Sequence, residues 1–273
     1  MITRKAFVEG SALLALAGPS LRAAEDLVHV QAGTLPIVLT APHGGSSAVP
    51  GVAPRDVAGK PASGAASYVI TRDWETDRLA MGIAAEIKVL TRKDVYLVMA
   101  RFHRKYIDAN RPPAVAFDSA EAKPTYDLYH QSIRGFVDEI RTRFAAGLLI
   151  DVHGQHAHPD ALVRGTHNGR TVTRLIARAG VAAVTGPQGL FGQLARNGFR
   201  VLPSNDLPPS GNNEDYTGFN GGYTVNRYGS QRPDGIDAVQ FEFGTRYREK
   251  AELERSIKRA AAAIVAFHQT HLK

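Results

Sequence analysis

Cysteine is absent from this chain of 273 residues. A chain without thiols cannot form a disulfide scaffold, a thiolate zinc cluster or a cysteine nucleophile, so any metal site must be built from histidine and carboxylate ligands. Apolar residues make up 44% of the chain and charged residues 22%, which suits an ordinary globular core. The composition excludes a disordered tail and a membrane bundle.

Long runs of like charge are also missing. The chain has 33 Lys+Arg and 26 Asp+Glu, a formal net charge of +7, yet no five basic residues follow one another. Basic residues that are spread in this way do not form the concentrated positive surface typical of nucleic-acid binding. We therefore expect no nucleic-acid partner.

The only long apolar segment lies at the N-terminus. Residues 1–24 have the layout of an export signal, with a basic start at Arg4 and Lys5, an apolar middle and a small-residue end. Residues 3–8 also resemble a twin-arginine export motif with Lys in the second arginine position; the alternative is a frayed amphipathic helix. No later segment reaches about 18 apolar residues. We therefore expect residues 25–273 to be a periplasmic or secreted domain without stable membrane insertion.

Strand-like and helix-like segments alternate along the rest of the chain. Short apolar runs predict strands over residues 35–41, 95–102, 146–152 and 238–243. Apolar residues at helical spacing predict helices over residues 73–90, 126–144 and 249–268. This alternation predicts one α/β domain whose sheet is covered by helices on both faces. Two loop-rich stretches, 44–67 and 203–222, are candidate walls of a cleft.

Two predicted strands end in histidine. His43 follows the first strand and His153 ends the third, each with glycine beside it. Strand ends are where α/β proteins place their sites, and two imidazoles plus one carboxylate are a standard ligand set for catalytic zinc. The carboxylate should come from the acidic cluster Asp73, Glu75 and Asp77, whose members also suit a helix N-terminus. The residues alone leave that choice open.

A second site at His156 and His158 is disfavoured, since a loop of surface histidines explains them.

Glu242 is a carboxylate on an otherwise apolar strand. In this strand Gln240 and Glu242 alternate with Val239, Phe241 and Phe243. The two polar residues therefore face one side of the sheet, and the three apolar residues face the other. A buried acid without a partner is costly, so Glu242 is either paired with a basic residue or catalytic.

Basic and amide groups follow the second strand. Arg104, Asn110 and Arg111 lie just after it, and Arg227 follows a glycine-rich turn later in the chain. Such groups can hold a substrate carboxylate by bidentate hydrogen bonds. The alternative is an exposed basic loop that pairs with nearby acids.

Six ordered blocks of residues together carry a family resemblance. The blocks are Pro42-His43-Gly44-Gly45, Asp73 to Leu79, Arg104 with Asp108 to Arg111, Asp151-Val152-His153, Gly221-Gly222-Tyr223 and Gln240-Phe241-Glu242. In order and spacing, over about residues 36–267, the chain resembles the N-formylglutamate amidohydrolase family. The chain departs from the family pattern at Gly154-Gln155, where typical members have Ser after the histidine, in the stretch 164–169, and in its export signal.

The resemblance implies a zinc-dependent hydrolase with a phosphorylase/hydrolase-like mixed sheet. It implies His43, Asp73 and His153 as zinc ligands, with Glu75 second to Asp73, and Glu242 as the general base. Arg104, Asn110, Arg111 and Arg227 would then position the carboxylate of an N-acyl amino acid or peptide. The alternatives are a periplasmic cell-wall amidase or carboxypeptidase and a noncatalytic binding protein for acidic ligands.

Overall fold

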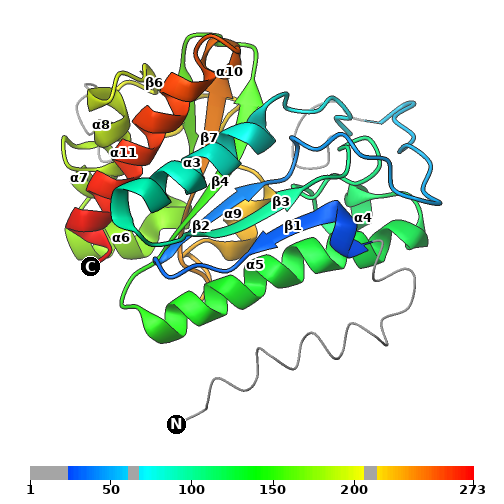
Figure 1. Cartoon of the computed structure of the whole chain (residues 1–273), viewed down its shortest axis with the longest axis horizontal. Coiled ribbons are helices and arrows are strands. Elements are labelled where there is room, and N and C mark those ends of the chain that lie inside the picture. Colours follow the sequence, from blue (N-terminus) through cyan, green and yellow to red (C-terminus); the bar gives the residue numbers. More distant parts are fainter. Residues whose placement is uncertain (1–23, 61–67, 206–213) are drawn as a thin grey trace.

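The computed structural model describes residues 24–60, 68–205 and 214–273. Within these residues seven strands form one mixed sheet in the order β1-β3-β2-β4-β7-β5-β6 (Figure 1). The strands are β1 (Val28–Gln31), β2 (Ile37–Ala41), β3 (Tyr96–Ala100), β4 (Leu148–Gln155), β5 (Leu162–Gly165), β6 (Val201–Leu202) and β7 (Asp237–Gly244). The predicted export signal lies outside the described residues, except for its last residue, Ala24.

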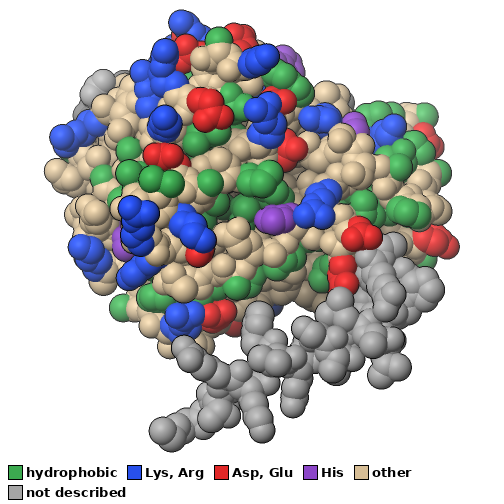
Figure 2. All heavy atoms as spheres, in the orientation of Figure 1, with side chains coloured by type: hydrophobic (Ala, Val, Ile, Leu, Met, Phe, Trp, Pro, Cys, Tyr) green, Lys and Arg blue, Asp and Glu red, His purple; other side chains and the backbone are tan. Residues whose placement is uncertain are grey.

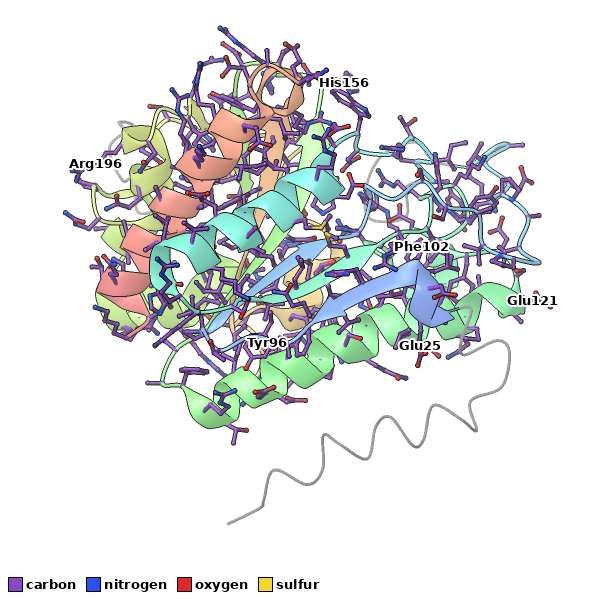
Figure 3. The ribbon with its side chains drawn as sticks, viewed as in Figure 1. Glu25, Tyr96, Phe102, Glu121, His156 and Arg196 are labelled. Carbon is purple, nitrogen blue, oxygen red and sulfur yellow. The ribbon has the colours of Figure 1, made fainter. Side chains whose placement is uncertain are left out.

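The four central strands are parallel. β3, β2, β4 and β7 are neighbours in this order, whereas β1 pairs antiparallel with β3 and β5 pairs antiparallel with β7. The central four are the strands that the sequence predicts. Their carboxyl ends therefore meet along one edge of the sheet, where Phe102 and His156 in Figure 3 follow the ends of β3 and β4.

Helices cover both faces of the sheet, so the predicted fold class is confirmed. Helices α3 and α11 pack on one face with α8, and α5 and α9 pack on the other (Figure 1). The helices are α3 (Thr76–Thr91), α4 (Pro113–Ala116), α5 (Lys123–Arg143), α6 (Thr173–Ala179), α7 (Ala182–Thr185), α8 (Leu190–Arg196), α9 (Tyr223–Tyr228), α10 (Thr245–Arg248) and α11 (Leu253–His271). Short 3-10 turns lie at Ala120–Ala122 and Arg170–Val172.

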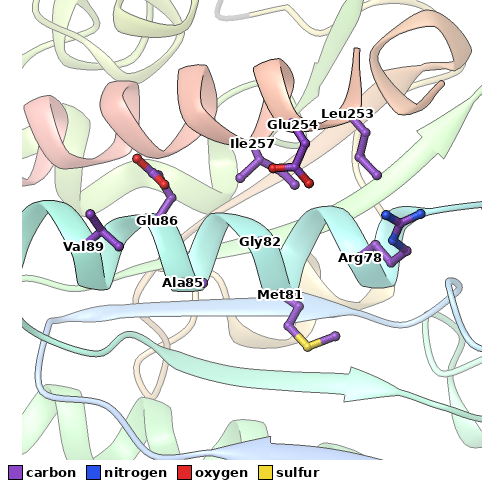
Figure 4. A pocket seen from close by; sticks show the side chains of 9 residues that line it. All are labelled: Arg78, Met81, Gly82, Ala85, Glu86, Val89, Leu253, Glu254 and Ile257. Atoms are coloured by element: carbon purple, nitrogen blue, oxygen red, sulfur yellow. The ribbon is translucent and has the colours of Figure 1, made fainter. Parts of the chain in front are cut away.

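The apolar stripe of α3 is the one that the sequence predicts. Leu79, Ile83 and Ile87 are fully buried against the sheet. On the neighbouring side of the helix, Gly82 lets α11 approach, since a Cβ there would lie 2.4 Å from Ile257 Cδ1. A groove of about 340 Å³ remains between the outer faces of the two helices (Figure 4). It lies in the helical layer and not at the strand ends.

The surface combines both signs of charge. On the face shown in Figure 2, basic and acidic side chains are interspersed rather than gathered in one block. Among the described residues, no helix combines the length and the apolar character that crossing a membrane requires.

Strand alternation decides which core each residue enters. In β4, Ile150 and Val152 belong to the core under α3 and α11, whereas Leu149 belongs to the core under α5. Asp151 and His153 have the same parity as Leu149 and therefore face the α5 side. The polar end of this strand thus lies on the face covered by α5 and α9.

His130 of α5 is a titratable group buried on that same side. Its Nε2 lies 3.0 Å from Ala109 O, to which it donates, and its Nδ1 lies 3.1 Å from the Tyr228 hydroxyl. Burial lowers the pKa of His130 from 6.5 to about 4, although the hydrogen bond to Ala109 opposes this change. The folded protein therefore holds His130 neutral.

Replacing His130 with Gln should remove a pH-dependent part of the stability. Between about pH 6.5 and pH 4 the unfolded chain binds a proton at this residue and the folded chain does not, so wild-type stability is lost as the pH falls through this window. The loss amounts to about 3 kcal/mol. In denaturant unfolding between about pH 7.5 and pH 4, the free energy of unfolding of the wild type should fall relative to that of His130→Gln. A difference that stays constant with pH would contradict this assignment.

Candidate metal centre

Three side chains converge at the carboxyl edge of the sheet. The Nδ1 atoms of His43 and His153 lie 3.1 Å apart, and Asp73 Oδ2 lies 3.3 Å from the first and 3.2 Å from the second. Both imidazoles are buried, and Asp73 is only partly exposed. β2 and β4 are adjacent parallel strands, so their ends bring the two histidines together although they are 110 residues apart.

The loop after β2 is shaped by a close contact with α3. Gly44 follows His43, and a Cβ at this position would lie 2.4 Å from the backbone nitrogen of Asp77. Only glycine allows this approach. Asp73 is tied to the same loop because its N–H donates to His43 O at 3.0 Å.

Each imidazole is backed by a buried carboxylate. His43 Nε2 lies 2.7 Å from Asp108 Oδ1, and His153 Nε2 lies 2.8 Å from Asp151 Oδ2. These contacts place a proton on each Nε2 and leave each Nδ1 able to present its lone pair. Such carboxylate–histidine pairs orient and strengthen metal ligands.

The donor set fits a zinc-class ion. Two imidazole nitrogens and one carboxylate oxygen face one another, and atoms bound to a tetrahedral zinc at about 2.0–2.1 Å are about 3.3 Å apart. The Gly154 N–H donates to Asp73 Oδ2 at 3.1 Å, which helps to hold this oxygen in place. These three residues could therefore hold a metal ion.

The electrostatics of the centre favour positive charge. Burial alone would lower the pKa of His153, but Asp151 and Asp73 outweigh burial and raise this pKa well above its usual value. Burial would also raise the pKa of Asp108, yet Arg104 and His43 hold that pKa well below its usual range. Asp108 is thus ionised, and the centre attracts a proton or a cation.

Between the acids of the 73–77 cluster, the geometry favours Asp73. Glu75 supplies no ligand atom to the centre, and its Oε2 accepts a hydrogen bond from Arg78 at 2.7 Å. The backbone of Glu75 has a positive φ of 65° just before α3. Asp77 lies in the first turn of α3, as expected for a helix N-terminal acid.

Glu242 lies beside the centre. It is the register partner of His153 on the adjacent strand β7, and the two residues therefore share a face of the sheet. Its Oε1 accepts a hydrogen bond from Gln240 Nε2 at 2.7 Å. Burial raises the pKa of Glu242 to about 7, although His153 opposes this effect.

Three of the predicted substrate-binding residues lie around the centre. Arg104 donates to Asp108 Oδ2 at 2.9 Å and lies 3.6 Å from Asp73 Oδ1. Asn110 Oδ1 accepts from Thr224 N at 2.8 Å, and its own N–H donates to Asp108. Arg111 donates to the Asn110 carbonyl at 2.8 Å. Arg104 and Asn110 therefore also support the His43 imidazole through Asp108.

Arg227 is placed elsewhere. It pairs with Asp234 at 3.4 Å, and Asp234 precedes the amino end of β7, at the opposite edge of the sheet. Helix α9 begins beside Asn110 and ends at Tyr228, so its last turn points away from the metal centre. The structure does not bring Arg227 to the site, in contrast to the prediction.

Asp108 and Asp151 were not predicted from the sequence as site residues. Asp151 carries a usable signal, because it precedes His153 by two residues in a strand and must share its face. Asp108 carries no periodic signal, since it lies in the loop between β3 and α4.

Comparison with known proteins finds a family match over part of the chain. Residues 35–122 match the model of the N-formylglutamate amidohydrolase family, which confirms the resemblance over the segment that contains His43, Asp73 and Asp108. The match supports a hydrolase that acts on amides and takes a small-molecule substrate. No curated protein matches the chain.

Two solved structures share the fold. The crystal structure of N-formylglutamate amidohydrolase from Ralstonia eutropha is 18% identical with a TM-score of 0.54, and the alignment covers 88% of this chain and 97% of that one. A gene product from Agrobacterium tumefaciens is 16% identical with a TM-score of 0.54, over 91% of this chain and 97% of that one. At these identities the likeness concerns the fold.

Replacing Asp73 or Glu75 with Ala should separate the roles of the two acids. Asp73→Ala removes an oxygen that faces both imidazoles, so it should weaken zinc binding about 10-fold or more. Glu75→Ala loses only an ion pair with Arg78 and should bind zinc like the wild type. Chelator competition followed by elemental analysis measures both. If Asp73→Ala binds zinc as tightly as Glu75→Ala and the wild type, Asp73 is excluded from the ligand set.

Proposed function

We propose that this protein is a zinc-dependent amidohydrolase that cleaves an N-acyl amide bond of a small carboxylate-bearing substrate, such as an N-formylglutamate-like compound. The observation that carries the proposal is the cluster of His43, Asp73 and His153, with a buried carboxylate behind each imidazole. The family match over residues 35–122 supports the amide substrate.

His43, Asp73 and His153 would hold the zinc ion. Bound zinc supplies Lewis acidity, which polarises a carbonyl group and makes water easier to deprotonate near neutral pH. Asp108 and Asp151 keep the two Nε2 protons in place, so that both Nδ1 atoms stay directed at the ion.

Glu242 is proposed as the general base. It would accept a proton from the attacking water at a carboxylate oxygen and pass it to the leaving amine nitrogen. Its place supports this role, because it shares a face with His153 on the next strand. Gln240 holds one of its carboxylate oxygens through a hydrogen bond.

Arg104, Asn110 and Arg111 are proposed to set the polarity of the substrate pocket. Arg104 and Arg111 bring two guanidinium groups to the loop beside Asp108, and positive charge there favours a substrate carboxylate. Arg227 is left out of this set because it pairs with Asp234.

The function is tested with a panel of N-acyl amino acids on zinc-reconstituted protein. Short N-acyl derivatives of acidic amino acids should be hydrolysed, with kcat/KM higher than for neutral analogues, because of the arginines near the centre. Preferential cleavage of cell-wall peptides would favour the amidase or carboxypeptidase alternative. Zinc binding without hydrolysis of any member would exclude the enzymatic proposal.

Glu242→Gln should retain zinc and the fold while losing activity. The amide keeps the shape of the side chain but cannot accept the water proton, so kcat should fall about 10²-fold or more. Glu75→Gln is the matched control, because it neutralises a nearby carboxylate that pairs with Arg78. Zinc content, melting temperature and turnover are measured on the same preparations. A zinc-loaded Glu242→Gln protein with full activity would exclude Glu242 as the base.

We also propose that the protein acts outside the cytoplasm, as a periplasmic or secreted enzyme. The support is the basic, apolar and small-residue layout of residues 1–24. Mass spectrometry of protein from the native host should find a mature chain that begins near Glu25. An intact chain from Met1 in the cytoplasm would overturn this proposal.

A further inference from the structure

Arg55 is a buried cation in the loop that follows His43. Its side chain is fully buried, although it lies in a stretch of the sequence that reads as an exposed Gly- and Pro-rich loop. Burying a guanidinium is costly unless carboxylate or carbonyl oxygens surround it. Among the described residues, Asp108 is the carboxylate within ion-pair distance, with 3.7 Å between Arg55 Nη2 and Asp108 Oδ2.

The hydrogen bonds of Arg55 join three separate segments. Its guanidinium donates to Val69 O at 2.7 Å, to Val115 O at 3.2 Å and to Arg104 O at 3.2 Å. Its backbone N–H donates to Lys105 O at 2.8 Å. Arg55 therefore fixes both the carbonyls at the start of the 104–108 turn and the loop that approaches this turn.

Asp108 is the point at which this network meets the metal centre. One of its oxygens accepts from His43 Nε2 and from Asn110 N, at 2.7 and 3.0 Å. The other oxygen faces Arg104 Nε at 2.9 Å and Arg55. The position of this carboxylate, and through it the direction of the His43 ring, depends on both guanidinium groups.

We propose that Arg55 is a positioning residue of the metal centre, which holds Asp108 in place and thereby orients His43 as a ligand. The inference rests on the proposed zinc site. Arg55 touches neither the three ligands nor the space between them, so its effect should appear in metal affinity rather than only in turnover. Ligand supports of this kind typically change metal affinity about 10- to 100-fold.

The chain offers a matched control at Asp118. This exposed carboxylate accepts from Asp56 N at 2.7 Å and lies 3.6 Å from Lys60 Nζ, so it ties down the same loop without contacting Asp108. Asp118→Ala should loosen the loop and leave the metal centre intact. It therefore separates loop anchoring from the action of Arg55 on Asp108.

The test compares wild type, Arg55→Met, Arg55→Lys and Asp118→Ala as full-length proteins. Zinc affinity is measured by chelator competition, and melting temperature is measured with and without zinc. Arg55→Met should bind zinc about 10-fold or more weakly and show a smaller zinc-induced rise in melting temperature. Arg55→Lys should recover part of the affinity, since it keeps the charge but not the fork. Asp118→Ala should match the wild type in zinc affinity.

Each contrary result has a distinct meaning. If the wild type binds zinc and both Arg55 variants bind it equally well, the role of Arg55 is excluded and the proposed function stands. If Asp118→Ala weakens zinc binding as much as Arg55→Met, the loop acts as a whole and Arg55 has no specific role. If the wild type itself binds no zinc, the proposed function fails together with this inference. Should Arg55→Met fail to fold, Arg55→Lys decides by the same measurement.

Discussion

The pairing of two buried carboxylates with two imidazoles is the constraint on which the site depends. Asp108 and Asp151 are both fully buried, and burial of an ionised carboxylate is unfavourable without partners. Each finds an imidazole Nε2 within 2.8 Å. This pairing turns both Nδ1 atoms inward toward Asp73, which leaves a pocket of lone pairs that requires a proton or a cation.

The two carboxylates are supported in different ways. Asp108 faces Arg104 and Arg55, so its charge is balanced by guanidinium groups as well as by His43. Asp151 has the Thr40 hydroxyl as its other partner, at 2.5 Å, on the neighbouring strand. The contacts that position His153 therefore come from strands, whereas the contacts that position His43 come from loops. Local opening of the loops would reach His43 first, since loops are stabilised by fewer buried contacts than central strands.

The sequence predicts the part of the site that parallel strands position. Four apolar runs identify the central strands, and polar residues at their ends identify His43, His153 and Glu242. The short strands β1, β5 and β6 were not predicted because they are only two to four residues long. Short strands owe their conformation to pairing with neighbours rather than to their own residues.

Residues placed by loops were harder to assign. Arg227 belongs to a glycine-rich segment that resembles a site wall, but the direction of the six-residue helix α9 carries its guanidinium toward Asp234. Arg55 shows the opposite case, because a residue in an apparently exposed loop is buried beside Asp108. Neither placement follows from periodicity, since each depends on where a loop crosses the sheet edge.

Gly154 follows His153 at a position where the sequence departs from the family pattern, and a neighbouring arginine fills the space beside it. A Cβ at Gly154 would lie 2.5 Å from Arg248 Cζ, so the guanidinium of Arg248 occupies the space that a side chain at position 154 would need. Arg248 donates from there to Gln155 O at 3.0 Å and also to Trp74 O. It thereby links the strand that carries His153 to the turn that carries Asp73. The absence of a side chain at Gly154 thus allows one buried arginine to fix the separation of two proposed ligands.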